Sequence, residues 1–298
     1  MAAKANFLPY PRVVFASDFL ARIERFSAEL AAARARGDEF GGRAVAAGGH
    51  DFVGYRPYHA GDDPRLVDWS AYARLDRALV RITRREAGER LLVCVDASAS
   101  MGAGPPGKWQ RAAEVACALV ALALREGSTA RICITPAEHS GLRSLMVDKP
   151  ARLVDLLNLF TRIQAGGRGG GAEVLRDDPE FARGGGGARF VISDFSACDP
   201  EPFRAHAQRG SDLNLIRILA PHELGLAPDG PVDWFDPERG EHLELEVETG
   251  VRARYAVLLA AELERWRTAL ATALGVRHSV HSSAEPFEDI VRGSLARC

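Results

Sequence analysis

Short apolar runs alternate with longer stretches of helical periodicity from residue 91 to the C-terminus, and this alternation limits the possible folds most strongly. The runs at 91–95 and 189–193 are continuous, as in strands buried on both faces of a sheet. Strands that alternate with helices predict a mostly parallel, doubly wound α/β sheet. The expected strands are 79–83, 91–95, 130–135, 142–147 at an edge, 189–193, 213–219 and 276–281, with a hairpin at 231–247, and the expected helices are 16–36, 108–125, 151–163, 172–181, 254–274 and one from 285.

The first 87 residues differ in character from the rest of the chain. Segment 16–36 carries an apolar stripe at helical spacing, whereas segment 41–61 is rich in glycine and aromatic residues and has no helical period. The stripe consists of Phe19, Leu20, Ile23, Phe26 and Leu30. We therefore expect residues 1–87 to form a helix and an irregular or β segment, both packed on a main domain that spans residues 88–298.

Composition limits the partners and the compartment. The net charge of −2 over 298 residues gives no general attraction to nucleic acid, so no nucleic-acid partner is expected. Five cysteines without a C-x-x-C pair argue against zinc and indicate a reducing compartment. Residues 1–15 lack the apolar region of a signal peptide, and the longest apolar stretch, 112–124, is too short to cross a bilayer. The sequence thus predicts a cytoplasmic protein without an integral membrane segment.

Two of the expected buried strands end at an aspartate, Asp96 and Asp194. In a doubly wound sheet, functional groups collect at the carboxyl ends of the strands. Asp96 begins an Asp-x-Ser-x-Ser loop, and alternation along the loop can bring Ser98 and Ser100 to the same side as the carboxylate. Carboxylate and hydroxyl oxygens suit Mg²⁺ best, with Mn²⁺ or Ca²⁺ as alternatives. The structural alternative is that both serines only cap the next helix.

The block at residues 52–69 reads Phe-Val-Gly-Tyr-Arg-Pro-Tyr-His-Ala-Gly-Asp-Asp-Pro-Arg-Leu-Val-Asp-Trp and is followed by Ala73-Arg74. With the 96–101 loop downstream, the chain resembles domain-of-unknown-function family 58, in which this block precedes a von Willebrand factor A-like domain. The resemblance is good over residues 40–103 and looser beyond. It implies a sheet of the von Willebrand factor A type and a soluble branch of the family.

The resemblance also implies a metal-ion-dependent adhesion site. Such a site uses an Asp-x-Ser-x-Ser loop, matched by residues 96–100, and an Asp from a third loop, matched by Asp194 directly or through water. The Thr of the second loop is absent from 165–171, where Arg168 occupies the expected position and could weaken cation binding or replace the cation. The resemblance implies a partner that donates an acidic side chain, and a chaperone-like role with a MoxR-type AAA+ ATPase on a client protein.

Charged and aromatic residues of the 52–74 block have two interpretations. Ion pairs between Asp62, Asp63 or Asp68 and Arg56, Arg65 or Arg74 could hold the N-terminal segment on the main domain. The same charges and aromatic rings could instead form a partner-binding face. The candidate partner-binding residues are Tyr55, Arg56, Tyr58, Asp62, Asp63, Arg65, Asp68, Trp69 and Arg168.

Several other functions receive less support from the sequence. Residues 102–108 fit the start of a phosphate-binding loop, but Trp109 stands where Ser or Thr is required. An aspartyl-phosphate hydrolase usually needs a second Asp where this chain has Ser98, and no His is placed by sequence to activate a serine. The Trp-Phe pair at 234–235 is more typical of a packed turn than of a binding site. We therefore expect a non-enzymatic interaction module, with a metal-dependent hydrolase or a scaffold with a degenerate metal site as alternatives.

Overall fold

The computed structural model describes most of the chain at the level of individual residues. The described residues are 12–36, 51–58, 72, 79–84, 90–103, 107–135, 143–169, 171–172, 174–183, 187–196, 198–207, 212–226 and 229–296.

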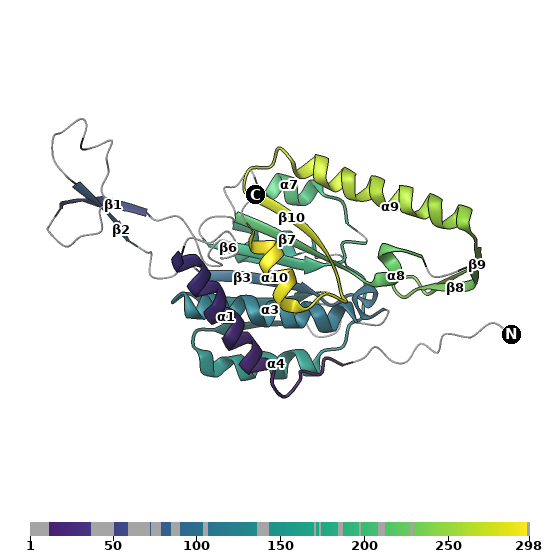
Figure 1. Ribbon diagram of the computed structural model, residues 1–298, viewed down its shortest axis with the longest axis horizontal. Coiled ribbons are helices and arrows are strands. Elements are labelled where there is room, and N and C mark those ends of the chain that lie inside the picture. Colours follow the sequence, from purple (N-terminus) through teal and green to yellow (C-terminus); the bar gives the residue numbers. More distant parts are fainter. Residues whose placement is uncertain are drawn as a thin grey trace.

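A six-stranded sheet forms the centre of the molecule (Figure 1). Its strands are β3 (Arg90–Asp96), β4 (Thr129–Thr135), β5 (Arg143–Val147), β6 (Ala188–Ser193), β7 (Asp212–Leu219) and β10 (Val276–Ser282). They lie in the order β10-β7-β6-β3-β4-β5, and every neighbouring pair is parallel except β4 and β5. The predicted mostly parallel sheet is confirmed, including its edge strand near residue 145.

The order of the strands creates a switch point between β3 and β6. The chain adds β4 and β5 on one side of β3, then crosses to β6 and adds β7 and β10 on the other side. Ligands of doubly wound sheets bind in the crevice at such a point, outside the carboxyl ends of the strands. Here β3 ends at Asp96, and Asp194 follows β6 directly. The topology therefore brings both aspartates to one place.

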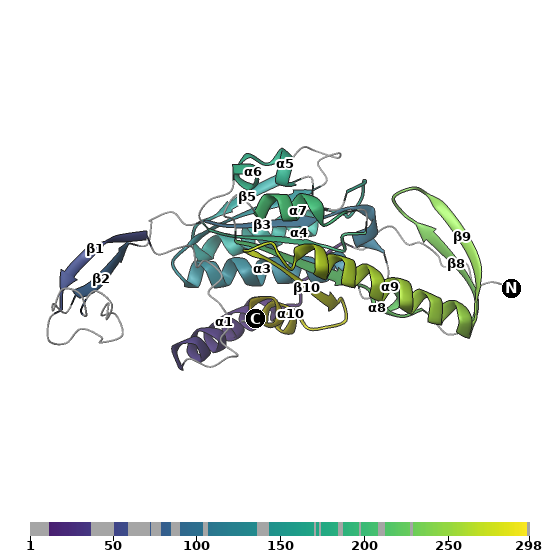
Figure 2. The same ribbon diagram turned by 90° about the horizontal axis from the view of Figure 1, so that it is seen from above.

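Helices cover both faces of the sheet (Figure 2). One face carries α1 (Phe19–Arg36), α3 (Lys108–Arg125), α4 (Leu153–Arg162) and α10 (Phe287–Leu295), and the other carries α5 (Val174–Asp177), α6 (Pro179–Arg183), α7 (Glu201–Ala207) and α9 (Thr249–Leu270). Successive residues of β3 alternate between the two cores. Leu91, Val93 and Val95 face the α3 side, whereas Leu92 and Cys94 face the α7 side.

The N-terminal helix and the N-terminal strands differ in their relation to the sheet. Helix α1 packs into the main core, where the rings of Phe19 and Phe26 lie 5.3 and 6.0 Å from the ring of Phe287. Strands β1 (Asp51–Pro57) and β2 (Leu79–Arg84) pair with each other in antiparallel fashion. They lie beyond one end of the six-stranded sheet (Figures 1 and 2). The expected packing of this β segment on the main domain is thus not seen in its described residues.

The expected helix at 172–181 is two short helices, because Asp178 and Pro179 interrupt it. Proline has no N–H for an intrahelical bond and favours the first turn of a helix. The Asp178 carboxylate accepts hydrogen bonds from the N–H groups of Glu180 at 2.9 Å and Phe181 at 3.1 Å. These bonds cap the start of α6, so a second helix begins where the first ends.

Other boundaries follow the sequence closely. The hairpin expected at 231–247 is confirmed as β8 (Gly230–Asp236) and β9 (Glu241–Val247). Helix α9 begins five residues before the expected position at 254, and the short helices α7 and α8 (Pro221–Leu224) were not predicted. None of the helices in the described part of the chain has the length and apolarity needed to cross a bilayer.

Gly187 provides a test of the way β6 enters the sheet. Its φ is +90°, and a Cβ atom there would overlap the main-chain oxygen of Arg90. We expect Gly187→Ala to lower the free energy of unfolding by at least about 2 kcal/mol, measured by urea denaturation. Gly240→Ala is the matched control, since Gly240 has a φ of +71° but no neighbour near its Cβ position, and should cost about 1 kcal/mol. Equal losses in the two variants would argue against the steric explanation.

Candidate functional site

Asp96 is completely buried at the end of β3. Its Oδ1 accepts a hydrogen bond from the N–H of Ser98 at 2.8 Å, and its Oδ2 accepts one from the hydroxyl of Ser193 at 2.6 Å. Burial and the nearby charge of Asp194 raise the pKa of Asp96 to about 7, although these hydrogen bonds act in the opposite direction. Among the described residues, the groups that donate hydrogen bonds to the Asp96 carboxylate are thus neutral.

The two loop serines lie together beside this carboxylate. Ser98 is buried, and its Oγ lies 3.0 Å from the Oγ of the partly buried Ser100. The second loop joins the first through main-chain hydrogen bonds from Gly166 N–H to Ala97 O at 2.7 Å and from Ala99 N–H to Gly167 O at 3.0 Å. The structure thus brings together Asp96, Ser98 and Ser100, and it places the 165–171 loop next to them.

Asp194 is also buried, but an internal cation already pairs with it. The ammonium group of Lys108 lies 2.6 Å from Asp194 Oδ2 and 2.6 Å from Glu223 Oε1, and its side chain has no exposed surface. Burial alone would lower the pKa of Lys108, but the two carboxylates outweigh burial and raise it. Burial would likewise raise the pKa of Asp194, but Lys108 outweighs burial and lowers it. Both groups are therefore charged at neutral pH.

The donor set fits a hard divalent cation in part. Asp96, Ser98 and Ser100 offer one carboxylate and two hydroxyl oxygens, which Mg²⁺ accepts together with water molecules. Asp194 has less freedom to bind a cation directly, because Lys108 holds Oδ2 and the N–H of Ser196 donates to Oδ1 at 3.0 Å. No group of three or more His, Cys, Asp or Glu side chains with metal-binding geometry occurs in the described residues. A cation here would depend on the serine hydroxyls.

Arg168 does not enter this group of side chains. Its side chain is exposed, and its Nε donates a hydrogen bond to the main-chain oxygen of Glu238 at 2.8 Å. From the sequence, Arg168 was expected to weaken cation binding or to replace the cation. The structure does not place it as a replacement, because the positive charge beside Asp194 belongs to Lys108.

The structure describes only three of the candidate partner-binding residues of the N-terminal block. Tyr55 and Arg56 lie in β1, and Tyr58 follows the end of that strand. The other candidates of this block, and the remaining members of the expected ion-pair network, lie outside the described residues. They are Asp62, Asp63, Arg65, Asp68, Trp69 and Arg74. Their role as a partner-binding face stays a prediction.

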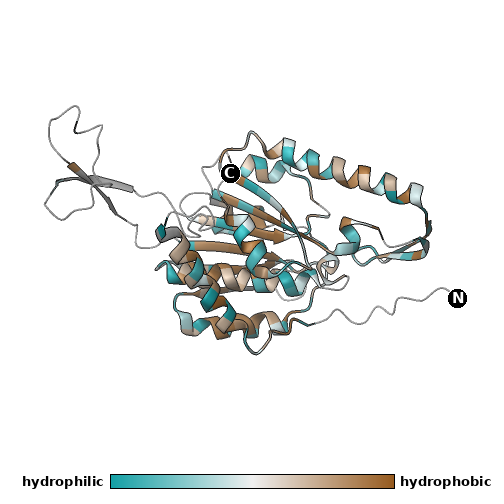
Figure 3. Cartoon of the chain, in the orientation of Figure 1, coloured by the Kyte–Doolittle hydropathy of each residue, from teal (hydrophilic) through white to brown (hydrophobic). Residues whose placement is uncertain are grey.

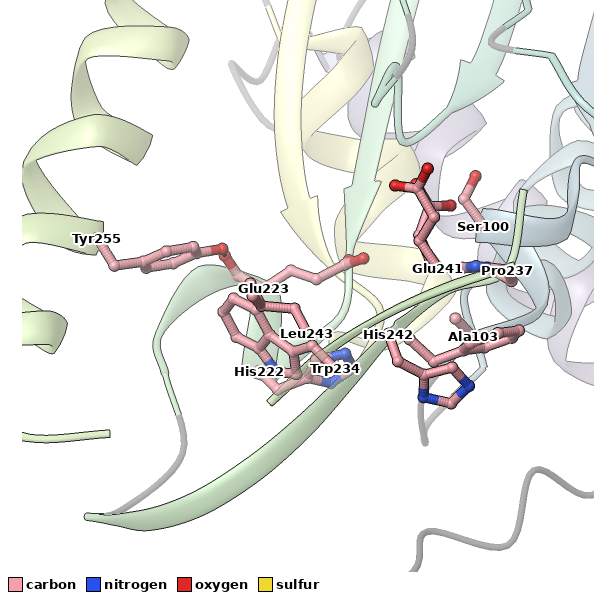
Figure 4. Close-up of a pocket in the computed structure, with 12 residues that line it drawn as sticks. Ser100, Ala103, His222, Glu223, Trp234, Pro237, Glu241, His242, Leu243 and Tyr255 are labelled. Atoms are coloured by element: carbon pink, nitrogen blue, oxygen red, sulfur yellow. Dashed lines mark hydrogen bonds between the residues drawn. The ribbon is translucent and has the colours of Figure 1, made fainter. Parts of the chain in front are cut away.

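A cavity of about 540 Å³ adjoins Ser100 (Figure 4). The β8–β9 hairpin and α8 form much of its wall, and Tyr255 of α9 closes one side. Its lining combines aromatic, acidic and imidazole side chains: Ser100, Ala103, His222, Glu223, Trp234, Phe235, Asp236, Pro237, Glu241, His242, Leu243 and Tyr255. The Trp-Phe pair, which was expected to pack in a turn, therefore lines a cavity next to the Asp-x-Ser-x-Ser loop.

Three site residues were missed by reasoning from the sequence alone. Lys108 was considered only as part of a phosphate-binding loop, and its position at the start of a helix gave no signal of burial, because lysine is almost never fully buried unless it is paired. Ser193 precedes Asp194 in the strand and carried no separate signal. Glu223 lies in α8, which the periodicity did not predict, and it is 115 residues away from Lys108 in the sequence.

The strand order and the site together define an α/β domain with an Asp-x-Ser-x-Ser loop at its switch point. A family model described as "Protein of unknown function DUF58" matches residues 54–265, and the chain belongs to this family. The resemblance noted from the 52–69 block is thereby confirmed.

Several known proteins are similar to this chain. Uncharacterised proteins of Mycobacterium tuberculosis and Mycobacterium bovis are 29% identical over 219 residues, which cover 69% of this chain. The matched region spans 66%, just under two thirds, of the length of those relatives. Among solved structures, the conserved hypothetical protein BatB from Bacteroides thetaiotaomicron has a TM-score of 0.38 at 12% identity, covering 69% of this chain and 96% of its own. The VWA domain of SpRpn10 has a TM-score of 0.40 at 9% identity, covering 68% and 93%.

Proposed function

We propose that this protein is a non-enzymatic interaction module that binds a protein partner through a divalent cation, with Mg²⁺ as the best-suited ion. The observation that carries the proposal is the buried Asp96 carboxylate beside two serine hydroxyls 3.0 Å apart, at the switch point of the sheet. The ammonium group of Lys108 forms its ion pair with Asp194 and not with Asp96, so a bound cation would supply the positive charge beside Asp96.

Each residue has a defined part in this proposal. Asp96, Ser98 and Ser100 would bind the cation directly, and Asp194 would act through water because its oxygens are engaged. The bound cation supplies a positive centre that binds an acidic side chain. The low protein charge around it leaves the cation electrophilic enough to accept that side chain as a further ligand.

The partner is inferred from the family resemblance. We propose a MoxR-type AAA+ ATPase, with this protein in a chaperone-like role on a client protein in the cytoplasm. A pull-down with wild type and an Asp96 variant, in Mg²⁺ and in chelator, would identify proteins that depend on both the carboxylate and the cation.

Thermal unfolding with and without Mg²⁺ tests the cation site itself. A ligand that binds only the folded state at a hundredfold excess over its Kd stabilises it by about 2.7 kcal/mol. We expect Mg²⁺ to raise the Tm of the wild type but not the Tm of Asp96→Asn. The substitution removes the only carboxylate among the three proposed direct ligands. Asp199→Asn is the control, since Asp199 pairs with Arg265 in solvent.

Two results would overturn the proposal. The first is the same Tm with Mg²⁺, Mn²⁺, Ca²⁺ and chelator in the wild type, which would favour a scaffold without a cation. The second is phosphatase or esterase turnover that requires Mg²⁺ or Mn²⁺ and is lost in Asp96→Asn, which would favour a hydrolase that uses the same site.

A further inference from the structure

One face of the β8–β9 hairpin carries acidic and apolar side chains at the cavity beside Ser100. Side chains alternate between the two faces of a strand, so Trp234 and Asp236 lie on the same face of β8. On β9, Glu241 lies opposite Asp236. Leu243 lies opposite Trp234, and all four residues line the cavity. This wall of the cavity therefore has an acidic half and an apolar half.

The Asp236–Glu241 pair sets two negative charges side by side, and like charges at opposite positions of two strands destabilise a hairpin. Glu241 is exposed and forms no hydrogen bond or ion pair within the described part of the chain. Asp236 accepts hydrogen bonds from the N–H groups of Glu238 at 2.9 Å and Arg239 at 3.2 Å, which close the turn. The Arg239 guanidinium lies 3.9 Å from Asp236 and is 67% exposed, so this ion pair contributes little.

Aromatic rings form the other end of the cavity. The ring centroids of Trp234 and Tyr255 are 6.0 Å apart at an interplanar angle of 63°, and the Tyr255 hydroxyl donates a hydrogen bond to the main-chain oxygen of Glu223 at 2.6 Å. Figure 4 draws Tyr255 and Trp234 at the end away from Ser100, with Glu241 on the Ser100 side. Rings held in this way can attract a cation over their faces.

The third carboxylate of the lining adds to the negative charge. Glu223 Oε1 accepts a hydrogen bond from the Lys108 ammonium group, but the same ammonium group also pairs with Asp194. One lysine and two carboxylates leave one net negative charge. Among the described residues, neither lysine nor arginine lines the cavity. A positively charged side chain from another molecule therefore complements this lining.

We infer that the cavity binds a basic side chain of the protein partner, and that arginine fits it best. A guanidinium group stacks on aromatic rings and binds carboxylates through paired N–H donors, whereas an ammonium group is a strongly hydrated point charge. Trp234 and Tyr255 supply the rings, and the Asp236–Glu241 pair accepts the N–H donors. The volume of about 540 Å³ lies within the range of about 300–1,000 Å³ that is typical of ligand pockets.

The assignment of this arginine to the partner that also reaches the cation rests on the proposed function. Because the cavity adjoins Ser100, one short segment of the partner supplies both the acidic side chain for the cation and the arginine for the cavity. A purely acidic segment is disfavoured, since Asp236 and Glu241 repel a second carboxylate. The partner is thus recognised by one acidic and one basic residue close together.

N-acetylarginine methylamide tests the cavity on the full chain in chelator, so that no divalent cation takes part. We expect it to shift the NMR signal of the Trp234 indole N–H in a saturable manner; Trp234→Phe identifies that signal. The neutral analogue N-acetylcitrulline methylamide should bind about three- to thirtyfold less tightly, because it cannot form a cation–π contact. N-acetyllysine methylamide should bind less tightly than the arginine probe.

Glu241→Gln separates the charge of the cavity from its shape. We expect this variant to bind the arginine probe about threefold less tightly or weaker, because it removes one of the two paired carboxylates. Glu244→Gln is the matched control, since Glu244 is exposed on the opposite face of β9 and does not line the cavity. Both variants should keep the wild-type Tm in chelator, which shows that they fold.

The outcomes separate this inference from the proposed function. Equal affinity for the arginine and citrulline probes, or equal affinity of Glu241→Gln and the wild type for the arginine probe, would overturn the inference. Tighter binding of the lysine probe would overturn the choice of arginine. Binding of the arginine probe in a protein whose Tm does not respond to divalent cations would leave the cavity standing and overturn the cation site. A response to Mg²⁺ without binding of any probe would do the reverse.

Discussion

Lys108→Met is expected to lower the free energy of unfolding by about 3–5 kcal/mol, because it leaves the buried Asp194 carboxylate without its cation. Methionine matches the lysine side chain out to Cε and lacks only the terminal nitrogen, so the loss of packing is small. Glu223, which the same ammonium group contacts, is partly exposed and can be hydrated by water. The cost therefore arises mainly at Asp194, and urea denaturation at neutral pH measures it.

A second substitution separates charge from packing in this prediction. The double variant Lys108→Met/Asp194→Asn removes both buried charges and should recover much of the lost stability, as replacing a whole buried ion pair often does. Arg204→Met is a surface control, since Arg204 and Glu201 form an exposed pair whose loss should hardly change the stability. A double variant no more stable than Lys108→Met alone would contradict the electrostatic explanation.

Much of the fold could be predicted because its signals are local. The run at 91–95 is apolar at every position, and β3 is buried on both faces in accordance with that pattern. Helix α3 has the boundaries expected from periodicity, 108–125, since its apolar positions extend from one end to the other. The split of the helix at 172–181 depends instead on the capping carboxylate of Asp178, a local feature that periodicity does not register.

The candidate site was only partly predictable, because its charge balance comes from distant segments. Asp96 and Asp194 could be paired from the rule that strand ends meet at the switch point. The position of the Lys108 ammonium group between Asp194 and Glu223 could not be predicted, since Lys108 and Glu223 approach each other only through the packing of α3 and α8. The placement of the hairpin tip near Ser100 likewise depends on tertiary contacts that no sequence pattern specifies.

Trp266→Ala is expected to destabilise the protein by about 3–5 kcal/mol and to release α9 from the sheet. Trp266 and Leu270 are the buried residues of this 22-residue helix, so its attachment depends on very few side chains. The Trp266 ring lies 4.4 Å from the guanidinium carbon of the buried Arg217 and packs on Phe195 at 5.2 Å. Its loss would leave a cavity and would remove one of the two aromatic faces that cover the Arg217 charge.

The consequence of this substitution should extend to the hairpin that borders the proposed cation site. Strand β9 ends at Val247 and α9 begins two residues later, at Thr249, so the hairpin and the helix are directly connected. Chemical denaturation should measure the loss of stability, and hydrogen exchange should be faster in both α9 and the 236–241 turn. Val257→Ala, at an exposed position on the same helix, should change neither quantity measurably. Faster exchange confined to α9 would show that the hairpin is held by its own contacts with the 165–171 loop, in which case the Arg168 hydrogen bond to Glu238 carries that attachment.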